Sequence, residues 1–197
     1  MKKKIFYVQI VFILILNSIL MNAQETKLPY HTIPEYPEKM TEAAILKRTI
    51  DGLGFRYYWA TEGLEEKDLE FKATENSRSS LQTLEHLHSL SKVILNAFEQ
   101  LPNQKSENEE LSYTELRSAT LNNFHKTSQI LQKTENVEDV QIIFDRDGQV
   151  STFPLWNLIN GPIEDAIWHC GQVVTLRRTS GNPINPKVNV FLGKLMD

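Results

Sequence analysis

Apolar residues recur every three or four positions through four long segments of the chain, and this spacing constrains the fold more than any other feature. The segments cover about Thr41 to Leu64, Ser79 to about Gln100, a stretch after the polar loop that ends at Glu110, and a last stretch that ends near Arg178. Each pattern predicts a helix with one buried face. The clearest buried positions are Leu46, Ile50, Leu53, Tyr57, Ala60, Leu64, Leu84, Leu87, Ile94, Phe98, Leu116, Thr120, Phe124, Thr127 and Leu131.

Local signals mark where several of these helices begin and end. Ser79 and Gln82 have the spacing of a capping box, in which each side chain accepts a hydrogen bond from the other residue's backbone N–H. Pro102 ends the second helix. The last helix begins at either Pro154 or Pro162, with Gly161-Pro162 as an internal kink or as the true start, and Gly181 ends it.

A short β-hairpin is predicted before the last helix. Two strand-like runs, 141–144 and 149–152, flank the turn signal Asp145-Arg146-Asp147-Gly148. Four long helices and a single hairpin predict an all-α four-helix bundle with a short β-hairpin insertion, whose sites are formed by inward side chains of facing helices.

The N-terminus resembles a secretory signal. Lys2, Lys3 and Lys4 precede an apolar run, and Met21-Asn22-Ala23 closes the segment. A retained membrane anchor is the alternative, because Ile5 to Met21 approaches the length that spans a bilayer. We expect a signal peptide over 1–23, an extended leader over 24–39 and one domain over 40–197, in a protein that is exported to the periplasm or secreted. Membrane contact is then expected only through the uncleaved signal.

Two features of the leader and first helix leave alternatives open. The leader contains three prolines without apolar periodicity, so it either lies on the domain or stays mobile. Gly52 and Gly54 each weaken the first helix by about 1 kcal/mol relative to alanine. They indicate close backbone packing, ligand access or simple tolerance.

Charge and cysteine content exclude some classes of protein. The full chain has 21 basic and 25 acidic residues, three of the basic ones lie in the signal, and the mature net charge is therefore about −7. Nucleic acid is not an expected partner. The single cysteine, Cys170, allows no internal disulfide, so the core must supply the stability.

The candidate site begins with Asp165 and His169, which stand one helical turn apart. At about 100° per residue they share a helix face with Gln172 and Leu176. An ionised carboxylate at the border of a buried face needs a partner. On the same geometry Cys170 points towards the apolar side, which favours inert packing over a role as a ligand or reactive thiol.

Among the remaining histidines, periodicity selects His86. It lies in register with apolar residues of the second helix, whereas His88, His125 and His31 are predicted at the surface. His86, Asp165 and His169 would give two imidazoles and one carboxylate with open positions for water or substrate. This set suits zinc, nickel, iron or manganese. The alternative is an Asp165–His169 hydrogen-bonded pair with a separately satisfied His86.

Two motifs together resemble the DinB/YfiT-like superfamily of metal-binding four-helix bundles. They are Ser79-Ser80-Leu81-Gln82-Thr83-Leu84-Glu85-His86-Leu87 and His169-Cys170-Gly171-Gln172-Val173-Val174. In that family one histidine follows a serine-rich helix start, and a histidine pair four apart ends in a His-Arg-Gly-Gln-like segment. His86 and His169 match, Asp165 replaces the earlier histidine of the pair, and Cys170 replaces the arginine. The segment 156–183 resembles exported members.

The resemblance implies a divalent metal held by His86, Asp165 and His169, often in a homodimer. Metal-dependent hydrolysis of an unknown small-molecule substrate is the first expectation, with Tyr57 or Arg56 near enough to orient that substrate. A non-catalytic metal- or ligand-binding module is the alternative. Thiol-dependent S-transfer is the third, and export argues against it because it removes the protein from cytoplasmic thiols.

Overall fold

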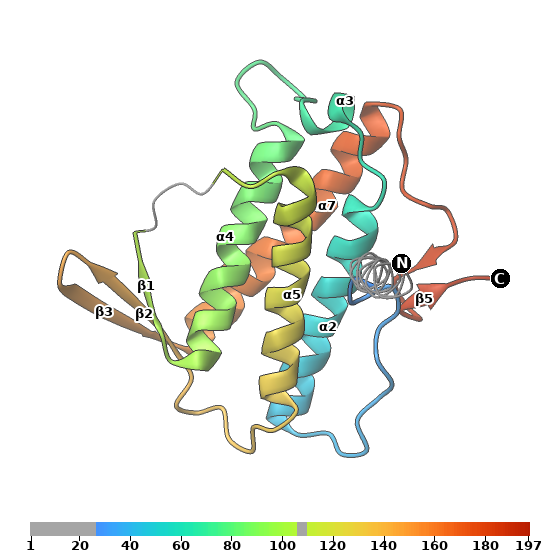
Figure 1. Ribbon diagram of the computed structural model, residues 1–197. Helices are drawn as coiled ribbons and strands as arrows, with labels where there is room; N and C mark the ends of the chain where they lie inside the picture. Colours follow the sequence, from blue (N-terminus) through green and yellow to red (C-terminus); the bar gives the residue numbers. More distant parts are fainter. Residues whose placement is uncertain (1–26, 106–109) are drawn as a thin grey trace, which may run out of the picture.

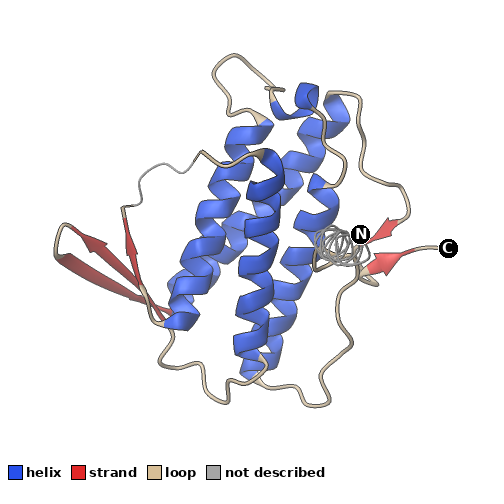
Figure 2. Cartoon of the chain, in the orientation of Figure 1, coloured by secondary structure: helices blue, strands red, loops and turns tan. Residues whose placement is uncertain are grey.

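The computed structural model describes residues 27–105 and 110–197, and the predicted signal over 1–23 lies outside them. The protein is mostly helical with small strands, which confirms the predicted all-α class (Figure 2). The long helices α2, α4, α5 and α7 lie side by side (Figure 1). Helix α5 and helix α7 each contact both α2 and α4. Their bounds are Glu42–Thr61 for α2, Ser80–Glu99 for α4, Tyr113–Leu131 for α5 and Glu164–Thr179 for α7.

The predicted apolar stripes form the core. Every stripe residue named above for the first three helices is at most 9% exposed. Leu101, two residues after the end of α4, is 49% exposed. The helix ends at Glu99 and Gln100 adopts the left-handed conformation, which turns Leu101 away from the core.

Capping boxes fix the starts of two helices. At α4, Ser79 Oγ accepts from Gln82 N at 3.2 Å and Gln82 Oε1 accepts from Ser79 N at 2.9 Å, as the sequence predicts. Ser112 and Glu115 make the same pair of contacts at α5. These boxes satisfy backbone donors that the first helical turn leaves free.

The last helix runs through Pro162 rather than beginning there. Helix α6, Leu155–Leu158, continues into a π-helical segment η1, Ile159–Ile163, and then into α7. Proline has no N–H, and the wider π turn accommodates it without ending the helix. Gly161-Pro162 is therefore an internal irregularity directly before Asp165.

The small strands lie outside the helices. Strand β2, Gln141–Arg146, pairs antiparallel with β3, Gln149–Pro154, around a turn in which Asp147 and Gly148 have positive φ. The other short elements are not predicted by the sequence patterns. These are helix α3 (Glu66–Leu69), strand β1 (Pro102–Gln104), which pairs parallel with β2, and a second hairpin of β4 (Val188–Asn189) and β5 (Lys194–Leu195).

The described part of the leader lies against the domain, which decides between its two alternatives. Tyr30 is 5% exposed, and a Cβ at Gly54 would stand 2.4 Å from its ring. Gly54 therefore permits close packing. His31 O accepts from Trp59 Nε1 at 3.2 Å, and Ile33 N donates to Gly193 O at 2.8 Å. The leader thus joins α2 to the C-terminal hairpin.

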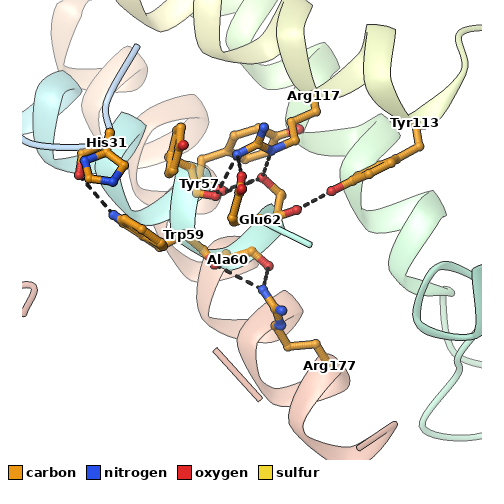
Figure 3. A network of polar contacts seen from close by, with 10 residues as sticks. His31, Tyr57, Trp59, Ala60, Glu62, Tyr113, Arg117 and Arg177 are labelled. Carbon is orange, nitrogen blue, oxygen red and sulfur yellow. Dashed lines mark hydrogen bonds and ion pairs between the residues drawn. The ribbon is translucent and has the colours of Figure 1, made fainter. Parts of the chain in front are cut away.

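The C-terminal end of α2 is capped by side chains from two neighbouring helices (Figure 3). From α7, Arg177 Nη1 donates to the carbonyls of Trp59 and Ala60 at 3.1 and 3.0 Å. From α5, Arg117 donates to the carbonyl of Tyr58, and the Tyr113 hydroxyl donates to that of Thr61. All four carbonyls that the helix end leaves free are thereby satisfied.

None of the described helices combines the length and apolar character needed to cross a bilayer.

Candidate metal centre

The structure brings His86, Asp165 and His169 together from two helices. His86 stands on α4, and Asp165 and His169 stand one turn apart on α7. Helices α4 and α7 contact each other directly. His86 and Asp165 are therefore in polar contact although they are 79 residues apart in the sequence. The predicted partnership of these three residues is therefore present as geometry.

The ligand-type atoms converge on one small volume. Asp165 Oδ2 lies 3.0 Å from His86 Nε2, and Asp165 Oδ1 lies 3.3 Å from His169 Nε2. The two imidazole rings are nearly perpendicular, with centroids 4.7 Å apart. One nitrogen or oxygen from each residue lies within 4.8 Å of the others, which is the spacing of atoms that share one ion.

The cluster lies at the solvent-accessible edge of the contact between α4 and α7 and not in the core. The side chains of His86, Asp165 and His169 are 30%, 39% and 17% exposed. The inward register predicted for His86 is thus only partly realised, because the neighbouring core contacts of α4 are made by Leu84 and Leu87. Water and a small molecule have access to the three residues.

Gln172 fixes the orientation of His169. Its Oε1 lies 2.7 Å from His169 Nδ1, and an amide oxygen only accepts, so Nδ1 carries the hydrogen. In a neutral imidazole, Nε2 is then the free lone pair, and it faces the Asp165 carboxylate. Two acceptors 3.3 Å apart repel each other unless a cation or a proton lies between them. The residues present therefore fit a cation, and a hydrogen bond on the distal nitrogen is typical of a metal-binding histidine.

The other histidines are not part of this cluster. His125 is exposed and contacts Gln129, as expected for a surface residue. His31 packs against Tyr58 and Trp59. His88, predicted at the surface, is half-buried, and its Nδ1 lies 3.2 Å from Thr120 Oγ1 on α5. His88 is more buried than predicted because α5 packs beside it, and the periodicity of α4 alone gives no information about a neighbouring helix.

Packing or hydrogen bonding within the fold accounts for the three other candidate residues, Tyr57, Arg56 and Cys170. Tyr57 is fully buried against Phe124, which leaves no room for a substrate at its ring. Arg56 Nη1 donates to Gly52 O at 3.0 Å on its own helix. Cys170 is 2% exposed, and burial raises the pKa of its thiol to about 12, so the thiol is protonated at neutral pH.

A match to a protein family spans the whole candidate site. The sequence model of the DinB family matches residues 56–189. The chain belongs to the DinB family. The matched segment includes α4 and α7, and therefore all three members of the cluster. Members of this family bind divalent metals, and the His-Asp-His cluster of this DinB protein is compatible with such an ion.

The other two comparisons add no relative. No curated protein matches the chain, and no solved structure matches it.

Proposed function

We propose that this DinB protein binds a divalent metal through His86, Asp165 and His169 and uses it in hydrolysis of a small-molecule substrate. The observation that carries the proposal is the convergence of three ligand atoms from α4 and α7 at a solvent-accessible rim. The four long helices would form a DinB-like bundle, with the β2–β3 hairpin inserted before the last helix.

The chain's own residues would divide the work as follows. His86 and His169 would offer neutral nitrogens, and Asp165 would offer a carboxylate that offsets the charge of the ion. Gln172 would keep His169 Nε2 directed at the site. When bound, a divalent ion supplies Lewis acidity towards a substrate oxygen and makes water a better nucleophile. Zinc, nickel, iron and manganese all suit this donor set.

A non-catalytic role is the second candidate, and the placement of the ligands supports it. The ion would join α4 to α7, so its binding would stabilise the bundle even without a reaction. The two candidates differ in what is lost on metal removal: stability alone, or stability together with turnover.

Elemental analysis of the purified protein, beside His86→Ala, Asp165→Ala and His169→Ala, tests the site. We expect about one divalent ion per chain in the parent protein and loss of most of it in each variant. His125→Ala, which removes an exposed histidine, is the matched control and should retain the ion. Unchanged metal content in the three variants would refute the site.

The metal-loaded protein is then assayed against ester, amide and phosphoester panels. Turnover that disappears in Asp165→Ala supports the hydrolase. A thermal shift on metal loading with no turnover on any panel favours the non-catalytic role. Thermal protection by bacillithiol, mycothiol or glutathione would instead favour the thiol-dependent transferase.

We also propose that the protein is exported and forms a homodimer. The N-terminal composition supports export, and the family resemblance supports the dimer. Mass spectrometry of the N-terminus after expression in an exporting host, together with light scattering, tests both. An N-terminus at Gln24 and twice the chain mass are the expected results.

A further inference from the structure

The turn of the β4–β5 hairpin exposes three consecutive apolar side chains. Val190, Phe191 and Leu192 are 51%, 88% and 42% exposed. Single exposed apolar residues are ordinary on protein surfaces, whereas three in a row at one projecting turn indicate a contact with an apolar partner. We refer to Val190–Leu192 as the apolar tip.

The apolar tip is held in one conformation by its own backbone contacts. Asn189 Oδ1 accepts from Phe191 N at 3.0 Å and from Leu192 N at 2.9 Å, and Asn189 O accepts from Gly193 N at 2.8 Å. Gly193 has a φ of +69°, which a glycine adopts without strain. The exposure is therefore built into an ordered turn, and little conformational entropy remains to be lost on binding.

The hairpin lies beside the start of the described chain. Ile33 N donates to Gly193 O, and the Ile33 side chain packs where a Gly193 Cβ would stand. Upstream of the leader, the sequence contains the apolar run Ile5 to Met21, which addresses the chain to a membrane either as a signal or as an anchor. The β1–β3 sheet projects from the opposite side of the molecule (Figure 1).

Size and charge favour a bilayer over a second copy of the chain. A stable protein–protein contact buries about 800 Å² on each partner, which three side chains do not supply. Interfacial membrane binding instead grows with the apolar area inserted and with attraction to anionic lipids, so a small apolar tip beside a lysine contributes to it. The first charged residue after the apolar tip is the exposed Lys194, which suits anionic headgroups, while the acidic Asp197 lies two residues beyond the end of β5.

We propose that the apolar tip inserts into the interfacial region of a phospholipid bilayer, with Lys194 at the headgroups. The domain would then meet the membrane through the β4–β5 hairpin. This contact is independent of the metal centre and adds a second membrane contact to the one expected from the N-terminal segment.

A fluorescent label at the apolar tip tests the insertion directly. The full chain carrying Phe191→Cys is expressed in an exporting host and purified with whatever N-terminal processing the host carries out. It is then labelled with the fluorophore NBD at position 191, because the only other cysteine, Cys170, is buried and does not react. Vesicles contain phosphatidylcholine and phosphatidylglycerol. We expect NBD fluorescence to rise at least threefold on vesicle addition and to be quenched by lipids brominated on the acyl chains. A retained N-terminal segment would bind vesicles by itself, so the environment of the label decides, not binding.

A label at Val150→Cys is the matched control, because Val150 is 63% exposed on the opposite sheet and should stay at its aqueous intensity. A second test uses unlabelled protein. The double variant Phe191→Ser/Leu192→Ser should no longer insert its hairpin into the bilayer. In the presence of vesicles, a protease should then cut after Lys194 at least tenfold faster in this double variant than in the control Val150→Ser. Aqueous intensity at position 191 on vesicle-bound protein would overturn the proposal. So would a rise that needs no lipid and grows with protein concentration, because a second copy would then cover the tip.

Discussion

Gln172 determines which nitrogen of His169 faces Asp165 in the His86–Asp165–His169 cluster. Replacing it by leucine removes the acceptor at His169 Nδ1 and frees the ring to rotate or to change tautomer. We expect Gln172→Leu to lower metal affinity by about 10- to 100-fold, measured by competition with a chelator. Gln129→Leu breaks a similar glutamine–histidine contact at exposed His125 and should leave the affinity unchanged.

Gly54 is the residue that allows the leader to pack. An alanine there favours the helix by about 1 kcal/mol but displaces the Tyr30 ring, and loss of such a buried aromatic costs about 3 kcal/mol or more. We therefore expect Gly54→Ala to destabilise the protein in urea unfolding. In a Tyr30→Ala background the same change should become neutral or stabilising.

Gly52→Ala is the control for that cycle, because its Cβ would meet only the flexible end of Arg56 at 3.2 Å. It should be neutral or stabilising in either background. Equal destabilisation by the two glycine substitutions would contradict the role given to Tyr30. The sequence indicated close packing at these glycines as one alternative, yet Tyr30 was not foreseeable as the partner, since its φ of 73° is unusual for a non-glycine residue.

At the scale of elements, the end of α2 depends on donors from α5 and α7. Arg177 is 3% exposed and donates to the carbonyls of Trp59 and Ala60, two residues that are themselves buried. We expect Arg177→Ala to lower the free energy of unfolding by about 3 kcal/mol, from unsatisfied buried acceptors and lost packing. Arg178→Ala, at the exposed neighbouring position, should change it by less than about 0.5 kcal/mol.

Helix α3 is tied to the end of α7 through the buried Asp68. Burial alone would raise its pKa, but hydrogen bonds from Ser180, Asn182 and the Glu65 backbone hold the pKa of Asp68 below its ordinary 3.8. A lowered folded-state pKa stabilises the fold at neutral pH, and this contribution is lost as pH falls below 3.8. Asp68→Asn should cost about 2 kcal/mol at pH 7, and the difference from the parent protein should shrink towards pH 3. A difference independent of pH would contradict this origin.

The long helices and the short elements differ in how far the sequence could predict them. Stripes of apolar residues over about 20 positions define α2, α4 and α5, and the capping box at Ser79 locates a boundary. Helix α3 and strands β1, β4 and β5 span two to four residues, too few for a period to be seen. The capping box at Ser112 and Glu115 was within reach of the same spacing rule. The partnership of His86 with α7 follows from register and resemblance, whereas its exposure depends on how two helices approach each other.

For the whole molecule, Gly193 is where the C-terminal hairpin meets the leader. An alanine there would combine an unfavourable positive φ with a 2.7 Å contact to Ile33. We expect Gly193→Ala to destabilise the protein by about 2 kcal/mol and to increase hydrogen exchange in residues 28–34. Gly63 also has a positive φ, but a Cβ there would meet nothing within 4 Å. Gly63→Ala should therefore lower the free energy of unfolding by the backbone cost of about 1 kcal/mol and leave hydrogen exchange in the leader unchanged.

The bond between Ile33 and Gly193 also sets an order of events during synthesis. The leader is synthesised about 160 residues before Gly193. Local helices form early, while a contact between such distant residues must wait until the later partner has been made. The leader of a nascent chain therefore stays accessible to proteases and chaperones until Gly193 has been synthesised, and its contact with the C-terminal hairpin forms only then.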